Sequence, residues 1–78
     1  MKKVLYPELV GEMAKRGDTQ EKLGEILGLT RASVLNKLAG KTEWTINEID
    51  TICKHYKKDY YELFKKNEYE LVRQKNYR

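Results

Sequence analysis

The sequence predicts a compact all-α domain, a bundle of five short helices. Five segments place apolar residues three and four positions apart, the spacing that lines one face of a helix. Residues that start or stop helices bound these segments, and no convincing strand pattern occurs before residue 65. The 78 residues fit one domain. We divide the chain into a helical domain, residues 1–64, and a basic C-terminal tail, residues 65–78.

The first two helices have clear boundaries. The first is expected to begin at Pro7, where the missing N–H of proline would be unpaired anyway, and to end at Gly17. The second is expected to run from about Thr19 to Leu27, with Thr19 or Asp18 as its N-cap. Their apolar faces are predicted to consist of Leu9, Val10, Met13 and Ala14 in the first helix and Leu23, Ile26 and Leu27 in the second.

The other three helices begin at residues that can cap them. Thr30 is the expected N-cap of the third helix, and Thr45 with Glu48 has the spacing of a capping box at the start of the fourth. The fifth helix is expected to open at Asp59. The residues expected to face inward are Val34, Leu35 and Leu38, then Ile49, Ile52, Cys53 and Tyr56, and finally Tyr60, Leu63 and Phe64.

The tail leaves two structures open. Residues 69–74 alternate in a way that suits a strand at a dimer edge, but the same residues would also prolong the fifth helix. The tail holds five cations and two acids, a net charge of +3, whereas residues 1–64 hold eleven cations and ten acids, a net charge of +1. Whatever the body binds must therefore be recognised through the local placement of charge.

Composition argues against several classes of protein. Cys53 is the only cysteine, which excludes a disulfide within the chain and, with no signal-like apolar stretch, indicates a cytoplasmic protein. No run of about 18 apolar residues could span a membrane. We see no catalytic set and no glycine loop for phosphate, and His55 is expected to be a surface histidine without metal-ligand spacing. We expect no enzyme, cofactor, metal site or small-molecule ligand.

The second and third predicted helices are separated only by Gly28-Leu29-Thr30, a spacing typical of a helix-turn-helix. Residues 19–41, TQEKLGEILGLTRASVLNKLAGK, resemble the Cro/repressor-type helix-turn-helix family of phage and bacterial regulators. The likeness extends over the five helices to Phe64. It implies a lambda-repressor-like DNA-binding domain in which the third helix enters the major groove of double-stranded DNA.

The resemblance also implies which residues meet DNA. Arg31 would bind a guanine edge and Asn36 an adenine edge, while Ala32 would offer a methyl group to thymine and Ser33 a hydroxyl to a base or a phosphate. For each of them, an ordinary solvated position in a helix is the alternative. The residues expected to contact phosphates are Gln20, Thr30, Lys37, Lys41 and Thr42.

The sequence departs from the family pattern at two places. Ala39 stands where the family often has an asparagine, which removes one possible phosphate contact. Lys57 and Lys58 replace the usual glycine and apolar residue between the last two helices, so the start of the fifth helix is expected to be less well anchored. Neither departure touches the surface expected to meet DNA.

Three functions remain open at this stage. The leading one is a sequence-specific transcriptional regulator, a small phage- or prophage-type repressor that binds a palindromic operator as a homodimer. The alternative is a protein-interaction module of the same fold, such as an antitoxin-like partner or an antirepressor. A non-specific nucleic-acid binder that uses the tail is less favoured, because the third helix lacks the exposed aromatic residues typical of single-strand binders.

Overall fold

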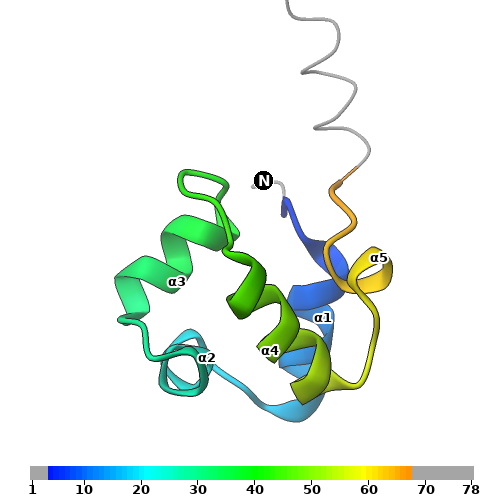
Figure 1. The fold of residues 1–78 in the computed structure, drawn as a ribbon, viewed down its shortest axis with the longest axis horizontal. Coiled ribbons are helices and arrows are strands. Elements are labelled where there is room, and N and C mark those ends of the chain that lie inside the picture. The colour runs from blue at the N-terminus through cyan, green and yellow to red at the C-terminus, as the bar shows by residue number, and fades with distance from the viewer. Residues whose placement is uncertain (1–3, 68–78) are drawn as a thin grey trace, which may run out of the picture.

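The computed structural model describes residues 4–67, and these form five helices and no strand (Figure 1). The helices are α1 (Pro7–Arg16), α2 (Gln20–Leu27), α3 (Arg31–Leu38), α4 (Ile46–Tyr56) and α5 (Tyr60–Leu63). The predicted all-α class with five helices is confirmed for this part of the chain. Among residues 4–67, no helix has the length and apolar character needed to cross a membrane.

The two structures predicted for residues 69–74 lie outside the described residues, so neither is tested. The division between a domain ending at residue 64 and a tail also stays a prediction. The described chain continues past that boundary as far as Asn67, whose backbone N–H donates to the carbonyl of Leu5 at 2.8 Å. The end of the described chain therefore lies against its beginning.

Side-chain caps set the starts of four helices, as the sequence predicts. Thr19, Thr30 and Asp59 each accept a hydrogen bond from the backbone N–H three residues later, at 3.0–3.1 Å. Thr19, and not Asp18, is the cap of α2. Thr45 and Glu48 form the complete capping box of α4, with hydrogen bonds of 3.0 and 3.1 Å. Each such cap stabilises the domain by about 1 kcal/mol.

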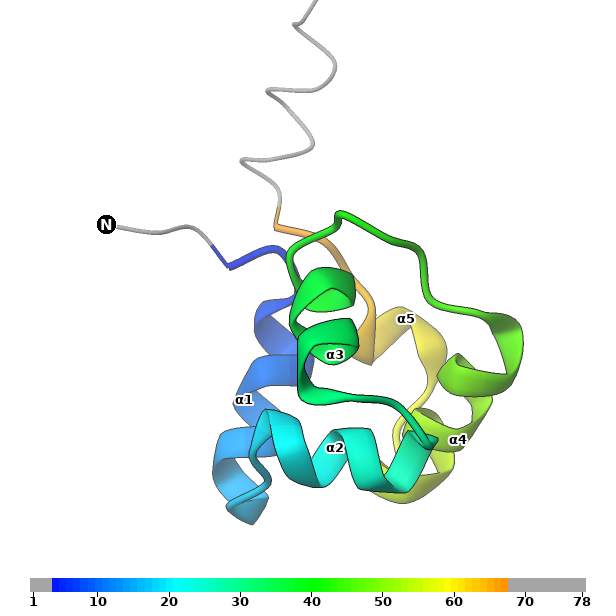
Figure 2. The same cartoon turned by 90° about the vertical axis from the view of Figure 1, so that its left-hand side faces the viewer.

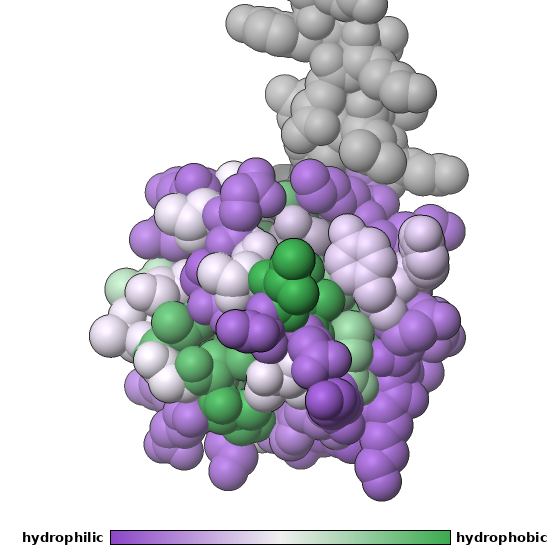
Figure 3. Space-filling model, viewed as in Figure 1, coloured by the Kyte–Doolittle hydropathy of each residue, from purple (hydrophilic) through white to green (hydrophobic). Residues whose placement is uncertain are grey.

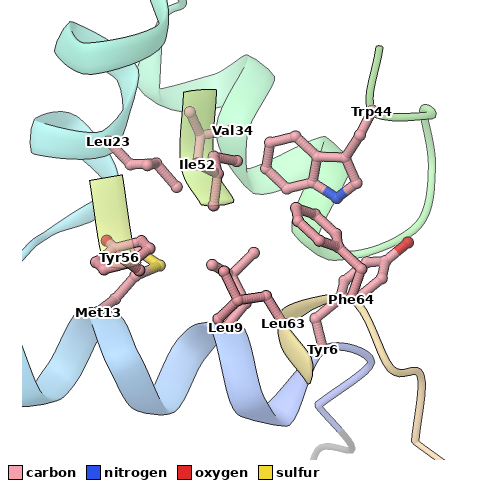
Figure 4. Close-up of a cluster of buried hydrophobic side chains, with 10 residues drawn as sticks. All are labelled: Tyr6, Leu9, Met13, Leu23, Val34, Trp44, Ile52, Tyr56, Leu63 and Phe64. Carbon is pink, nitrogen blue, oxygen red and sulfur yellow. The ribbon is translucent and has the colours of Figure 1, made fainter. Parts of the chain in front are cut away.

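The core lies where the five helices meet, with α4 between the α2–α3 pair and α5 (Figures 1 and 4). Its buried apolar residues are Tyr6, Leu9, Met13, Leu23, Val34, Trp44, Ile52, Tyr56, Leu63 and Phe64. Tyr6, Trp44 and Phe64 meet edge to face, with ring centroids 5.7–6.5 Å apart. This aromatic cluster joins the segment before α1, the loop between α3 and α4, and the end of α5.

Three residues differ from the predicted inward faces. Val10 and Ala14 are exposed because the inward side of α1 is formed by Leu9, Met13 and the buried Glu12. Tyr60 is 50% exposed, because α5 has only four residues and turns Leu63 toward the core. The Tyr60 ring stacks instead on the outer side of Phe64, with centroids 5.7 Å apart.

His55 is also not the plain surface histidine that the sequence predicts. Its Nε2 lies 3.2 Å from Oδ2 of Asp18, and the Tyr56 hydroxyl donates to the same oxygen at 2.9 Å. The hydrogen bond from Tyr56 is the main reason why the pKa of Asp18 lies below its usual value. Asp18 thus joins the turn between α1 and α2 to the end of α4.

The connection between α4 and α5 is better anchored than the sequence predicts. Lys58 is half-buried and its Nζ lies 3.6 Å from Oε2 of Glu12 on α1. Lys57 ends α4 in the left-handed conformation, with φ 56° and ψ 44°, and is the one non-glycine residue with positive φ in the described chain. A side chain with a Cβ is strained there.

Replacing Lys57 with glycine should therefore raise the free energy of unfolding by about 0.5–1 kcal/mol, because glycine enters the left-handed region without a Cβ clash. Urea denaturation followed by circular dichroism measures the change. Lys54→Gly is the matched control, since it removes the same side chain from inside α4 and should cost about 1 kcal/mol. A lower free energy of unfolding for both variants would show that the left-handed cap is not strained.

The turn between α2 and α3 depends on Gly24. A Cβ at this position would lie 2.6 Å from the backbone oxygen of Leu29, closer than real Cβ atoms approach. The Leu29 N–H donates to the Gly24 carbonyl at 2.8 Å, so the turn is held against α2 at this point. The backbone oxygen cannot move aside without moving the start of α3.

Gly24→Ala should accordingly lower the free energy of unfolding by about 1–3 kcal/mol through overpacking. Gly11→Ala is the control, because Gly11 also lies within a helix but a Cβ there would meet nothing within 4 Å. This control should gain about 0.5–1 kcal/mol. Equal effects of the two substitutions in urea denaturation would contradict the close approach of α2 and the turn.

Candidate nucleic-acid interface

The helices α2 and α3 lie together on one side of the domain, the side turned to the viewer in Figure 2. Gly28 ends α2 in the left-handed conformation, with φ 74°, and Thr30 caps α3 two residues later. This short connection sets α3 across α2. The inner side of α3 packs on the domain and its outer side is free.

The outer side of α3 carries two of the four residues predicted to contact bases. Val34 is fully buried and marks the inner side. At about 100° per residue, Ala32 and Asn36 lie roughly opposite Val34, and both are exposed. Arg31 is exposed at the first position of the helix. The structure therefore exposes a methyl group and an amide on the outer side of α3, and a guanidinium at the N-terminal end of the helix.

Ser33 and Thr30 interact with each other at the start of α3. The Thr30 hydroxyl accepts a hydrogen bond from the Ser33 N–H and donates one to Ser33 Oγ, both at 3.1 Å. The Thr30 proton is thus used within the helix start. Of the two hydroxyl groups, that of Ser33, which is half-buried, keeps its proton for another acceptor.

Gln20, Lys41 and Thr42, three of the residues predicted to contact phosphates, flank α3. Gln20 is the first residue of α2 and is half-buried, while Lys41 and Thr42 are exposed just after α3. The backbone N–H groups of Lys41 and Thr42 both donate to the Asn36 carbonyl, at 2.9 and 3.4 Å. These two residues can therefore donate hydrogen bonds to a ligand only through their side chains.

Lys37 lies apart from the other predicted phosphate contacts. Its Nζ donates to the Glu43 carbonyl at 2.7 Å and lies 3.1 Å from Oε1 of Glu48. The Lys37 side chain is only 12% exposed and its ammonium lies 5.9 Å from the centre of the Trp44 ring. The sequence identifies Glu48 as a capping residue but gives no sign of this second partner.

The charge around α3 favours an anionic ligand. No acidic residue occurs between Leu27 and Thr42, and α3 has none in its first turn. The exposed cations Arg31 and Lys41 form no ion pair with any residue in the range 4–67. Two cations without an acidic partner in this range therefore flank α3, one at its start and one just after its end, and the N-terminus of α2 carries a positive partial charge of its own.

Comparison with known proteins agrees with this geometry. The family model described as a Cro/C1-type HTH DNA-binding domain matches residues 9–68, which include all of α2 to α5 and most of α1. No curated protein and no solved structure matches the chain. Because the family model covers most of the 78 residues, the chain belongs to the family of Cro/C1-type helix-turn-helix DNA-binding domains.

Proposed function

We propose that this protein is a sequence-specific transcriptional regulator, a small phage- or prophage-type repressor that inserts α3 into the major groove of its operator. The observation that supports this most directly is the outer side of α3. There Ala32 and Asn36 are exposed opposite Val34, which lies in the core, and Arg31 is exposed at the N-terminal end of the same helix, which contains no acid. Bound at a promoter, the protein would repress transcription by occupancy alone.

Base recognition follows from the chemistry of the three exposed side chains. The Arg31 guanidinium can donate two hydrogen bonds to O6 and N7 of guanine, and the Asn36 amide can pair with N6 and N7 of adenine. Ala32 contributes a methyl group that suits the methyl of thymine. Each good bidentate contact contributes about 1–3 kcal/mol of discrimination against the wrong base.

Contacts to phosphates would set the height and register of α3 in the groove. Gln20 and the N-terminal N–H groups of α2 favour an anion on one side of α3. Lys41 and Thr42 follow α3 on the other side, and the Ser33 hydroxyl keeps a proton to donate. These contacts would hold the DNA without distinguishing its sequence.

A homodimer on a palindromic operator is the second part of the proposal. One domain offers few base contacts, and two half-sites about 34 Å apart would place both copies of α3 on one face of the DNA. The exposed rings of Tyr60 and Tyr61 on α5, 50% and 82% exposed, are available for a second copy. Figure 1 supports this surface, because α5 lies across α4 from α3 and a contact there leaves α3 free.

A protein-interaction module remains the second candidate, favoured by a separate surface. On the face shown in Figure 3, apolar side chains gather near the centre within a largely hydrophilic rim. Ile46, at the start of α4, is 84% exposed, an unusual setting for an isoleucine. A partner protein could cover this area whether or not α3 binds DNA.

Arg31→Ala and Lys41→Ala should weaken binding in different ways. Arg31→Ala should relax the preference at one position of each half-site, because it removes a base contact worth about 1–3 kcal/mol. Lys41→Ala should weaken binding to all sequences alike and reduce the salt slope by about one unit, because it removes a phosphate contact. Binding titrations on matched and mismatched duplexes at several salt concentrations measure both effects.

Lys54→Ala is the control for these titrations, because Lys54 is an exposed lysine of α4 that pairs with Asp50 at 3.0 Å. It should change neither the base preference nor the salt slope. Uniform losses of affinity for both Arg31→Ala and Lys41→Ala would contradict the assigned division between base recognition and phosphate contact.

The function itself is tested by selecting bound sequences from a random duplex pool at one fixed salt concentration. The proposal expects a palindrome whose half-sites lie one helical turn apart. A pool that stays random, with affinity that collapses as salt rises, would overturn sequence-specific regulation. The protein-interaction function would then be the better explanation of the fold.

A further inference from the structure

The ammonium group of Lys37 is already engaged within the domain. An ammonium carries three N–H donors. One donates to the Glu43 carbonyl at 2.7 Å and another faces Oε1 of Glu48 at 3.1 Å. The centroid of the Trp44 ring lies 5.9 Å from the same nitrogen. With side-chain exposures of 12% for Lys37 and 14% for Glu48, water has little access to the ion pair.

These contacts join three parts of the chain that the proposed function uses together. Lys37 belongs to the last turn of α3, Glu43 to the loop between α3 and α4, and Glu48 to the first turn of α4. The loop itself carries Lys41 and Thr42, the proposed phosphate contacts. Its beginning is tied to the Asn36 carbonyl, and its end is held by Trp44 in the aromatic cluster. Lys37 fastens the middle of the loop.

We infer that Lys37 is a positioning residue, which with Glu48 fixes the α3–α4 loop against the recognition helix instead of contacting phosphate itself. The consequence is a set distance between the phosphate contacts of Lys41 and Thr42 and the base contacts of Arg31 and Asn36. This inference rests on the proposed function for its effect on DNA binding. The fastening of the loop is a property of the free protein as well.

Glu48 is suited to this role because it already has a fixed position. Its Oε1 accepts the Thr45 N–H at 3.0 Å within the capping box and faces Lys37 from the other side. Burial alone would raise the pKa of Glu48, but the hydrogen bonds from Thr45 and Lys37 outweigh burial and lower it. The carboxylate is thus charged at neutral pH and holds the ammonium in one place.

Two substitutions separate positioning from direct contact. Lys37→Met keeps an aliphatic chain beside Trp44 but removes the charge, and Glu48→Gln removes the charge while glutamine still suits the capping box. Positioning predicts that each weakens operator binding by roughly 3- to 30-fold with no change in the salt slope. Direct phosphate contact predicts a salt slope lower by about one unit for Lys37→Met, and tighter binding for Glu48→Gln because a negative charge is lost.

A double-mutant cycle with Lys41→Ala gives the sharper test. If Lys37 positions the loop, Lys41→Ala should cost less affinity in the Lys37→Met protein than in the wild type. If Lys37→Met only destabilised the protein, Lys41→Ala would cost the same affinity in both backgrounds once affinity is calculated for the folded fraction. Urea denaturation determines that fraction for each variant. Lys37→Arg keeps the charge and should restore most of the affinity, and Lys54→Ala should show no coupling to Lys41→Ala.

Hydrogen exchange of the free protein tests the fastening without DNA. In Lys37→Met and in Glu48→Gln, the amides of Lys41 and Thr42 should exchange at least about tenfold faster, while amides within α1 and α2 keep their rates. Unchanged exchange in the loop would overturn the inference even if operator binding is found. Faster loop exchange in a protein that selects no duplex sequence would instead reject the proposed function and leave the fastening intact.

Discussion

The close approach of α2 to the turn before α3 is the contact on which the rest of the structure depends. Helix α3 has only eight residues, too few to be stable alone in water. Its conformation is maintained by the Thr30 cap and by the burial of Val34. The burial of Val34 requires the turn to lie directly on α2, which the missing Cβ of Gly24 allows. The orientation of the outer side of α3 therefore follows from a backbone contact on its inner side.

The inner and outer sides of α3 have separate tasks for this reason. Val34 commits one side to the core, so the side carrying Ala32 and Asn36 contributes nothing to packing. Substitutions on that side can alter the DNA sequence that is recognised without lowering the stability of the domain. Lys37 lies between the two sides, and its ammonium turns toward Glu43 and Glu48 rather than outward.

The sequence predicts most of the fold because the signals involved are local. The capping box of Thr45 and Glu48 spans one helical turn, and so does the cap of Thr30 on Ser33. The His55–Asp18 contact joins positions 37 residues apart, and no local sequence pattern predicts it. The partial exposure of Tyr60 also depends on tertiary structure, because the apolar spacing of α5 does not reveal that the helix stops after one turn.

The candidate site likewise combines features that the sequence predicts with features that it does not. The exposure of Ala32 and Asn36 follows from helical periodicity once Val34 is placed inside, and Arg31 is exposed as the first residue of the helix. The position of Lys37 does not follow, because a lysine has a long flexible side chain that can turn outward to solvent or inward to an acid. The Lys37 side chain turns inward because of Glu48, eleven residues later, and because of the path of the α3–α4 loop, which helical periodicity does not predict.

Ion pairs within the domain also determine which positive charges remain for DNA. Glu12 lies within 4 Å of Lys15, Arg16 and Lys58, while Asp50 pairs with Lys54 and Glu48 with Lys37. These contacts neutralise cations on α1, on α4, at the end of α3 and in the connection between α4 and α5. Within residues 4–67, Arg31 and Lys41 have no such acidic partner, so their charges are not reduced in this way. A body with a net charge of only +1 can thus present a locally positive surface around α3, which is where the proposed function needs it.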